Sequence, residues 1–218
     1  ARIKSTQPEE RIVKVKDHSL FLNESASKSA QSHESQNFHF NKVIDTMDDQ
    51  VEMTNSIEEF NLSRLLEGHN SCLLSFGQTY AGKSYTIFGE DEKYTPDYSP
   101  GNLKDKRGIV PRALEYLFEK AEELDDIREF VITVSFFEIY LDQVRDLGRA
   151  AAEAGELVPT NKFGLGNWNY ESERLEVYEN TNGLILVKNL TSFVLVDIDD
   201  LYRLLKNGFK TRQKYESK

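Results

Sequence analysis

The sequence lacks any run of about 18 apolar residues, the length that a helix needs to cross a bilayer, which excludes a membrane span. It does not open with a charged segment followed by an apolar one, the form of a secretory signal. Its single cysteine, Cys72, cannot form a disulfide within the chain, which favours a reducing, intracellular setting. The four histidines are scattered without paired spacing, so we expect no structural metal site.

The balance of charge is acidic, with 37 Asp and Glu against 27 Lys and Arg and a formal net charge of -10. Nucleic acids bind basic surfaces, so we expect neither nucleic acid nor a membrane as a partner. Hydrophobic residues make up 39% of the chain, enough for the packed core of a globular domain. The 218 residues fit one domain or part of a larger one, and since the chain begins at Ala1 without a methionine we expect it to be a piece of something longer.

The first third of the chain predicts short strands followed by a helix. Alternating apolar residues predict small strands within residues 1–24 and at residues 38–40, separated by an exposed loop that is rich in serine, glutamine and histidine. From residue 49 to residue 67 the apolar spacing becomes helical, and Gly68 stands where that helix would end.

The middle of the chain contains two apolar runs with a helical segment between them. Residues 72–76 (CLLSF) have the length of a strand, and residues 130–140 (FVITVSFFEIY) predict a strand buried on both faces. Residues 110–124 have helical spacing, either as a second helix or as the resumption of an interrupted one. Residues 90–106 predict a long loop, and loops of that length are usually functional or disordered.

The last third predicts an insertion, a hairpin and a helix. Residues 148–170 are irregular, so we interpret them as a surface insertion. Two short apolar runs on either side of Asn182 and Gly183 predict a hairpin. Residues 197–207 predict a closing helix with acidic residues in its first turn and with Gly208 at its end.

Residues 77–84 (GQTYAGKS) match the phosphate-loop pattern G-x-x-x-x-G-K-[ST], between the predicted strand and a helix that continues from Tyr85. In such a loop the backbone N–H groups converge on phosphate oxygens, aided by the positive end of the helix. We expect Lys83 to reach the β- and γ-phosphates and Ser84 to offer its hydroxyl to Mg²⁺. The flanking elements disfavour the alternative, a glycine-rich turn with an incidental Lys-Ser pair. The predicted loop ligands are Gly77, Gln78, Thr79, Tyr80, Ala81, Gly82, Lys83 and Ser84.

Tyr80 occupies a position of this loop that is often glycine, where the backbone needs a positive φ. A tyrosine held in that conformation costs on the order of 1 kcal/mol or more. The result is either weakened or faster-exchanging nucleotide, or a re-routed loop that still binds. We expect binding to be retained with reduced quality.

Four blocks of sequence resemble the kinesin motor head. Residues 66–70 (LEGHN) and 73–86 (LLSFGQTYAGKSYT) are similar to LEGYN and IFAYGQTGSGKTYTM, residues 107–113 (RGIVPRA) to RGIIPRA, and residues 134–147 to VSYLEIYNEKIRDLL. The blocks come in family order and spacing over about residues 38–210. The resemblance implies an α/β P-loop NTPase fold with a kinesin-type mixed central sheet flanked by helices. Residues 1–218 would be an incomplete part of it, the P-loop half that ends before switch I.

The resemblance also implies further site residues. Tyr85 would lie beside the adenine of ATP or ADP, and Ser84 would bind Mg²⁺. The family's Arg-x-Arg-Pro strand end, which packs on the purine, is matched only by Arg2-Ile3-Lys4-Ser5, so we carry over Arg2 alone. Glu138, inside the apolar run, is expected to be part of the scaffold.

Two family elements, a switch I run resembling NxxSSRSH and a switch II run resembling DLAGSE, occur nowhere in the sequence. In the family they position the attacking water, complete the Mg²⁺ shell and sense the γ-phosphate. We therefore predict no catalytic residue, and we do not expect this chain alone to hydrolyse ATP.

The resemblance implies the nucleotide-binding part of a kinesin-like, microtubule-associated ATP-driven motor in the cytoplasm, on the cytoskeleton. Any dimer or larger assembly would form through regions outside this chain. An alternative is a catalytically impaired, motor-derived structural protein on microtubules, for instance in a ciliary axoneme. A P-loop NTPase of another family is disfavoured by the block at residues 134–147.

Overall fold

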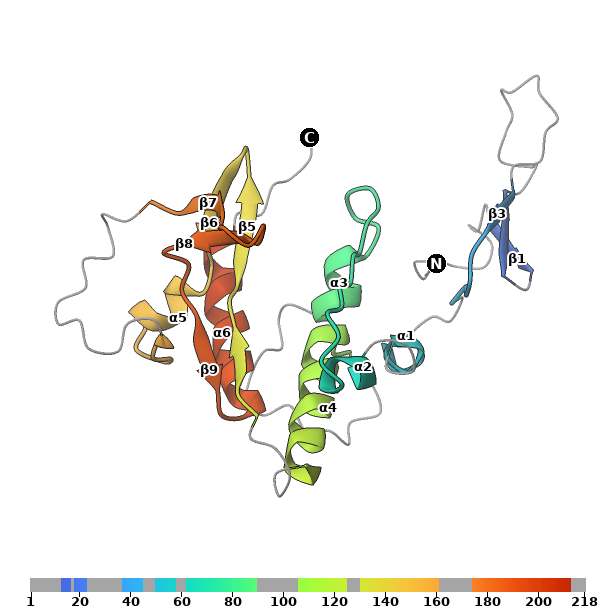
Figure 1. Ribbon diagram of the computed structural model, residues 1–218. Helices are drawn as coiled ribbons and strands as arrows, with labels where there is room; N and C mark the ends of the chain where they lie inside the picture. Colours follow the sequence, from blue (N-terminus) through green and yellow to red (C-terminus); the bar gives the residue numbers. More distant parts are fainter. Residues whose placement is uncertain are drawn as a thin grey trace. The chain divides into compact units, whose positions relative to one another are not determined.

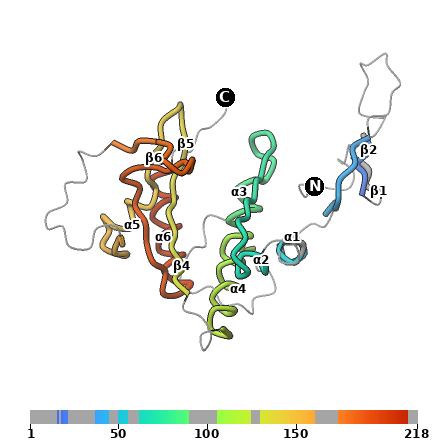
Figure 2. The backbone as a smooth tube through the Cα atoms, viewed as in Figure 1, coloured from blue at the N-terminus to red at the C-terminus, as the bar shows by residue number. Residues whose placement is uncertain are grey.

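The computed structural model describes residues 13–16, 18–22, 37–44, 50–57, 62–89, 106–124, 130–160 and 174–212. The chain divides into two compact units, the first formed by residues 1–89 and 101–113 and the second by residues 90–100 and 114–218 (Figures 1 and 2). The predictions for Arg2 and for the loops at residues 25–36 and 90–105 lie outside the described residues. Among the described residues, no helix has the length and apolar character needed to cross a membrane.

A three-stranded antiparallel sheet, in the order β1-β2-β3, opens the first unit. Its strands are β1 (Val13–Lys16), β2 (Ser19–Leu22) and β3 (Asn37–His39). Ser19 lies opposite His39 in the register, and the Ser19 hydroxyl is hydrogen-bonded to His39 Nδ1 at 2.7 Å. The short strands predicted for this part of the chain are confirmed.

Two helices lead toward the phosphate loop, α1 (Gln50–Ile57) and α2 (Ser63–Leu66). Gly68 follows α2 with a φ of 92°, and its N–H donates to the carbonyl of Leu65 at 3.0 Å. A left-handed glycine in this position ends a helix by satisfying one of its last carbonyls. Helical structure is confirmed at residues 50–57 and 63–66 of the predicted stretch, as is its glycine stop, whereas residues 58–61 lie outside the described residues.

The helix after the phosphate loop is α3 (Lys83–Phe88), and α4 (Ile109–Glu123) begins beyond the long loop. Gly89 and Arg107, which lie at the two ends of that loop, form an isolated antiparallel bridge. A Cβ added to Gly108 would lie 2.5 Å from the Gly89 nitrogen and 2.5 Å from the Ile87 carbonyl, so only glycine fits. Both predicted helices are confirmed, and the close approach of two glycines joins the roots of the loop.

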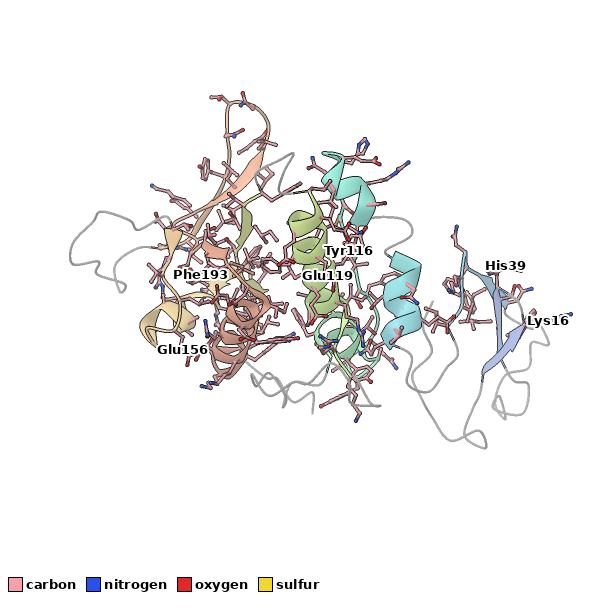
Figure 3. All side chains as sticks on the ribbon, turned by 90° about the horizontal axis from the view of Figure 1, so that it is seen from below. Lys16, His39, Tyr116, Glu119, Glu156 and Phe193 are labelled. Atoms are coloured by element: carbon pink, nitrogen blue, oxygen red, sulfur yellow. The ribbon has the colours of Figure 1, made fainter. Side chains whose placement is uncertain are left out.

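The core of the second unit lies between a strand pair and the last helix. Strands β4 (Ile132–Val134) and β9 (Phe193–Leu195) pair antiparallel, and α6 (Ile198–Thr211) packs against β9 (Figure 1). Phe193, labelled in Figure 3, is fully buried, as is Leu204 of α6. The Asp197 carboxylate accepts from the Asp200 N–H at 3.0 Å and caps α6 as its acidic first turn predicts.

Two hairpins complete the second unit. Strands β5 (Phe137–Tyr140) and β6 (Gln143–Asp146) meet at Leu141 and Asp142, which both have a positive φ. Strands β7 (Glu176–Glu179) and β8 (Ile185–Lys188) pair antiparallel around the predicted turn, so that hairpin is confirmed. Small antiparallel sheets and helices together make a partial α/β domain.

The prediction of a strand at residues 72–76 was wrong. The segment is extended but unpaired, its Leu74 and Phe76 side chains are 76% and 85% exposed, and Cys72 is exposed too. A strand exists only through hydrogen bonds to a neighbour, and the described part of the chain supplies none to this segment.

The prediction of one strand buried on both faces at residues 130–140 was also wrong. The run divides into β4 and β5, and exposed residues alternate with half-buried ones along both, with Ile139 70% exposed. The break falls at Phe136, whose carbonyl accepts from the N–H groups of both Leu147 and Gly148 at 2.9 Å. These two bonds turn the chain out of the β4 ladder.

Two predictions near the C-terminus need correction. Within the predicted irregular insertion, α5 (Arg149–Glu153) is a regular helix that packs on α6, with Ala151 fully buried. Gly208 does not end the last helix but lies inside it. It is a glycine because the Phe136 ring occupies the place of a side chain there, 2.5 Å from an added Cβ. The small residues Ala151 and Gly208 allow neighbouring elements to pack closely.

Candidate functional site: the phosphate loop

The phosphate loop is a tight turn that leads directly into α3. The Ala81 N–H donates to the Gln78 carbonyl at 3.2 Å, which closes the turn. Tyr80 and Gly82 both take the left-handed conformation, with φ values of 65° and 89°. Gly82 is the N-cap of α3, so the chain passes from a left-handed residue straight into the helix.

The phosphate-loop pattern requires two glycines, and a different physical constraint disfavours a side chain at each of them. Gly77 has a φ of 150°, and a Cβ there would lie 3.2 Å from the Ala81 Cβ, so the turn would be crowded. At Gly82 an added Cβ would meet nothing within 4 Å, and its φ of 89° alone disfavours other residues. The space above Gly82 is therefore open to a ligand.

The Lys83 side chain folds back over the loop. Its ammonium group donates to the Gly77 carbonyl at 2.8 Å and to the Gln78 carbonyl at 2.7 Å. An ammonium has three N–H donors, so the third remains for an anion in the loop. The positive charge predicted for phosphate binding thus lies at the loop itself.

Helix α3 is held by its own backbone hydrogen bonds and by one side chain of α1. The Tyr85 carbonyl accepts from the Gly89 N–H at 2.9 Å and from Gln50 Nε2 at 2.7 Å. The Thr86 N–H donates to the Gly82 carbonyl at 2.9 Å, and Thr86 is buried. Gln50 was not predicted as a site residue, and the only signal for it in the sequence is a polar residue in the predicted helical stretch.

The structure brings nearly all predicted site residues together in the first unit. Residues 77–81 are exposed, and residues 82–85 are half-buried at the start of α3. Arg2 lies outside the described residues. Among the described residues, no group of three or more His, Cys, Asp or Glu side chains is placed to hold a metal ion. The placed loop ligands and their neighbour are Gly77, Gln78, Thr79, Tyr80, Ala81, Gly82, Lys83, Ser84 and Tyr85.

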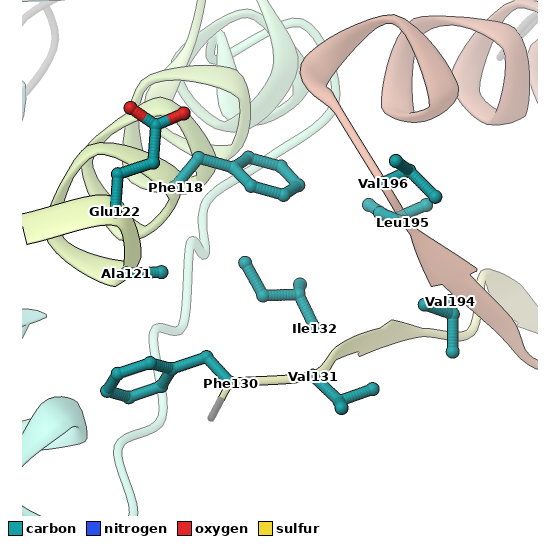
Figure 4. Close-up of a pocket in the computed structure, with 9 residues that line it drawn as sticks. All are labelled: Phe118, Ala121, Glu122, Phe130, Val131, Ile132, Val194, Leu195 and Val196. Carbon is teal, nitrogen blue, oxygen red and sulfur yellow. The ribbon is translucent and has the colours of Figure 1, made fainter. Parts of the chain in front are cut away.

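A pocket of about 420 Å³ lies in the second unit and has a different character (Figure 4). Apolar side chains of α4, β4 and β9 line it, among them Phe118, Ile132 and Leu195, and its only charged residue is Glu122. A site for chemistry usually has several converging polar groups in an apolar pocket. The phosphate loop remains the candidate functional site.

The loop conformation, the lysine over it and the helix that follows have the form of the phosphate loop in the P-loop class of proteins. The family model of the kinesin motor domain matches residues 2–218, which is nearly the whole chain. The chain therefore belongs to the kinesin motor domain family.

Individual relatives agree with this assignment. The chain is 29% identical over 189 residues to the kinesin heavy chain of Gibberella moniliformis, which covers 86% of this chain and 16% of that protein. It is 32% identical over 164 residues to the kinesin-like protein KIF1A of Rattus norvegicus, covering 75% of this chain and 8% of that protein. The kinesin-like protein KIN-5C of Arabidopsis thaliana is 26% identical over 180 residues. The chain spans between 8% and 20% of the length of the curated relatives it matches.

Proposed function

We propose that this chain is the nucleotide-binding part of a kinesin-like, microtubule-associated, ATP-driven motor. The observation that carries the proposal is the ammonium group of Lys83, bonded to two carbonyls of a loop whose Tyr80 and Gly82 are left-handed. That arrangement has the positive charge and the backbone turn that a phosphate group needs. Membership of the kinesin motor domain family supports the purine nucleotide and the microtubule as partners.

In this proposal the loop residues share the binding of ATP or ADP with Mg²⁺. The N–H groups at the start of α3 have no partner within the helix, so they are suited to phosphate oxygens. Lys83 would bind the β- and γ-phosphates, and Ser84 would bind the Mg²⁺ ion together with phosphate oxygens, since Mg²⁺ usually takes ligands from both protein and nucleotide. Tyr85 would lie beside the adenine, with Arg2 near the purine.

We also propose that β4 belongs to a kinesin-type mixed central sheet. Val131, the residue directly before β4, is 65% exposed, which supports this because apolar strands of an α/β domain are normally covered on both faces. The proposed setting is the cytoplasm, on microtubules. We propose neither nucleic acid nor a membrane as a partner, in keeping with the net charge of -10.

The test is the affinity of the full-length protein for ADP that carries a fluorescent group on its ribose. Lys83→Ala removes a charged donor, and hydrogen bonds to charged groups contribute roughly 1.5–3 kcal/mol, so affinity should fall roughly 10- to 150-fold. Lys120→Ala is the matched control, because Lys120 is a lysine of α4 bonded to Glu123. Equal affinity in the wild type and in Lys83→Ala contradicts the proposal.

A second candidate is a motor-derived structural protein on microtubules with impaired turnover, for instance in a ciliary axoneme. It is favoured by Tyr80, a bulky residue held at a φ of 65° inside the phosphate loop. Microtubule-stimulated ATP hydrolysis by the full-length protein separates the two candidates. Brisk turnover supports the motor, whereas nucleotide binding with little turnover supports the structural protein.

A further inference from the structure

Helix α3 carries Lys83, Ser84 and Tyr85, yet it is only six residues long. Isolated helices of that length are unstable in water, because nucleation costs more than a single turn returns. Its position therefore depends on contacts with the rest of the first unit. One of those contacts is the hydrogen bond from Gln50 Nε2 to the Tyr85 carbonyl oxygen, which also accepts from the N–H of Gly89, the C-cap of α3.

Gln50 is as buried as a residue of the core. It is the first residue of α1 and is only 1% exposed. The Thr54 hydroxyl, also buried, donates to the Gln50 carbonyl at 2.8 Å and fixes the start of α1. A buried amide is costly unless it is hydrogen-bonded, so the 2.7 Å bond to the Tyr85 carbonyl constrains both partners.

The second anchor of α3 lies at its C-terminal end. Gly89 follows the helix, forms the bridge with Arg107 and approaches Gly108 so closely that neither glycine accepts a side chain. This anchor fixes where α3 ends. The bond from Gln50 acts in the middle of the helix, two residues beyond Lys83, and so it controls the orientation of the residues at the phosphate loop.

We infer that Gln50 is a positioning residue of the nucleotide site, which holds α3 so that Lys83, Ser84 and Tyr85 face the ligand together. Gln50 itself touches no nucleotide. The inference rests on the proposed function, because it assumes that the loop binds a nucleotide. Without the bond, α3 loses a restraint at Tyr85, and contacts on the phosphate side and the base side weaken at the same time.

The experiment uses the full-length protein and fluorescent ADP, with three variants. Gln50→Met keeps the length of the side chain but removes the donor, and Gln50→Glu keeps its shape but places a carboxylate against the Tyr85 carbonyl. Asn55→Met is the control, since Asn55 is an exposed residue of the same helix. Loss of one net hydrogen bond should raise the ADP dissociation rate roughly 3- to 10-fold in Gln50→Met, more in Gln50→Glu, and not in the control.

A second readout separates positioning from a general loss of stability. Bound ligand raises the melting temperature by an amount that depends on its Kd, so the ADP-induced rise should shrink in Gln50→Met but stay at the wild-type value in Asn55→Met. The inference is wrong if a folded Gln50→Met releases ADP at the wild-type rate. It is also wrong if neither Gln50 variant folds, because Gln50 is then a residue of the core alone. A wild-type protein that binds no ADP overturns the proposed function, and this inference with it.

Discussion

Replacing Tyr80 by glycine tests the reading of the phosphate loop at the residue where this sequence departs from the usual pattern. Tyr80 has a φ of 65° and its side chain is 67% exposed, so the substitution relieves backbone strain while little buried surface is lost. A non-glycine residue in this region costs roughly 1–2 kcal/mol. Glycine also lowers the stability of the folded protein by roughly 0.5–1 kcal/mol, because it gives the unfolded chain more conformational freedom. Overall stability should therefore change by about 1 kcal/mol or less.

The effect on nucleotide binding should be clearer than the effect on stability. A strain of about 1 kcal/mol reduces the population of the binding conformation by a factor of roughly five, so Tyr80→Gly should bind ADP up to about five times more tightly. The assay is the Kd and dissociation rate of fluorescent ADP with the full-length protein. Asparagine tolerates the left-handed region and valine does not, so affinity should fall in the order Gly, Asn, Tyr, Val at this position. A glycine variant that binds no better than the wild type, or a valine variant that binds as well, refutes the strain argument.

Two further predictions concern the stability of the first and the second unit. Gly108→Ala puts a Cβ 2.5 Å from backbone atoms of Ile87 and Gly89, so it should destabilise the protein by about 2 kcal/mol or more, measured as a fall in melting temperature. Its control is Gly155→Ala, where an added Cβ meets nothing within 4 Å and only the backbone conformation is strained. In the second unit, Asp146→Ala removes the acceptor of the Arg149 N–H at 3.0 Å and of the Thr191 N–H at 2.8 Å, which should cost about 2–4 kcal/mol in thermal unfolding without changing ADP affinity.

The local part of the site could be predicted from the sequence. The turn, the glycines at both ends and the start of α3 depend on residues within eight positions of one another, and residues 77–84 contain all of that information. Gln50 could not be predicted, because its partner is a backbone carbonyl 35 residues further along the chain. A polar residue in a predicted helical stretch is ordinarily a solvent-facing one.

The apolar runs were misjudged for a related reason. Residues 72–76 and 130–140 have the composition of buried strands. Composition shows only that a segment is apolar enough to be buried. Whether it is buried depends on a neighbouring strand or helix, and Phe76 is 85% exposed in the described structure. The pairing of β4 with β9 joins residues some 60 positions apart, which hydrophobic periodicity does not encode.

Gly68 and Gly208 show which features of a glycine can be predicted from neighbouring residues and which depend on tertiary packing. Both follow helical stretches in the sequence, so the same rule predicts a helix end at each. Gly68 obeys it, because its left-handed conformation lets its N–H reach the Leu65 carbonyl. Gly208 does not, since the helix continues to Thr211, and its lack of a side chain instead leaves room for the Phe136 ring. A glycine that faces a ring from a distant part of the chain is part of the core, and only the fold distinguishes it from one that ends a helix.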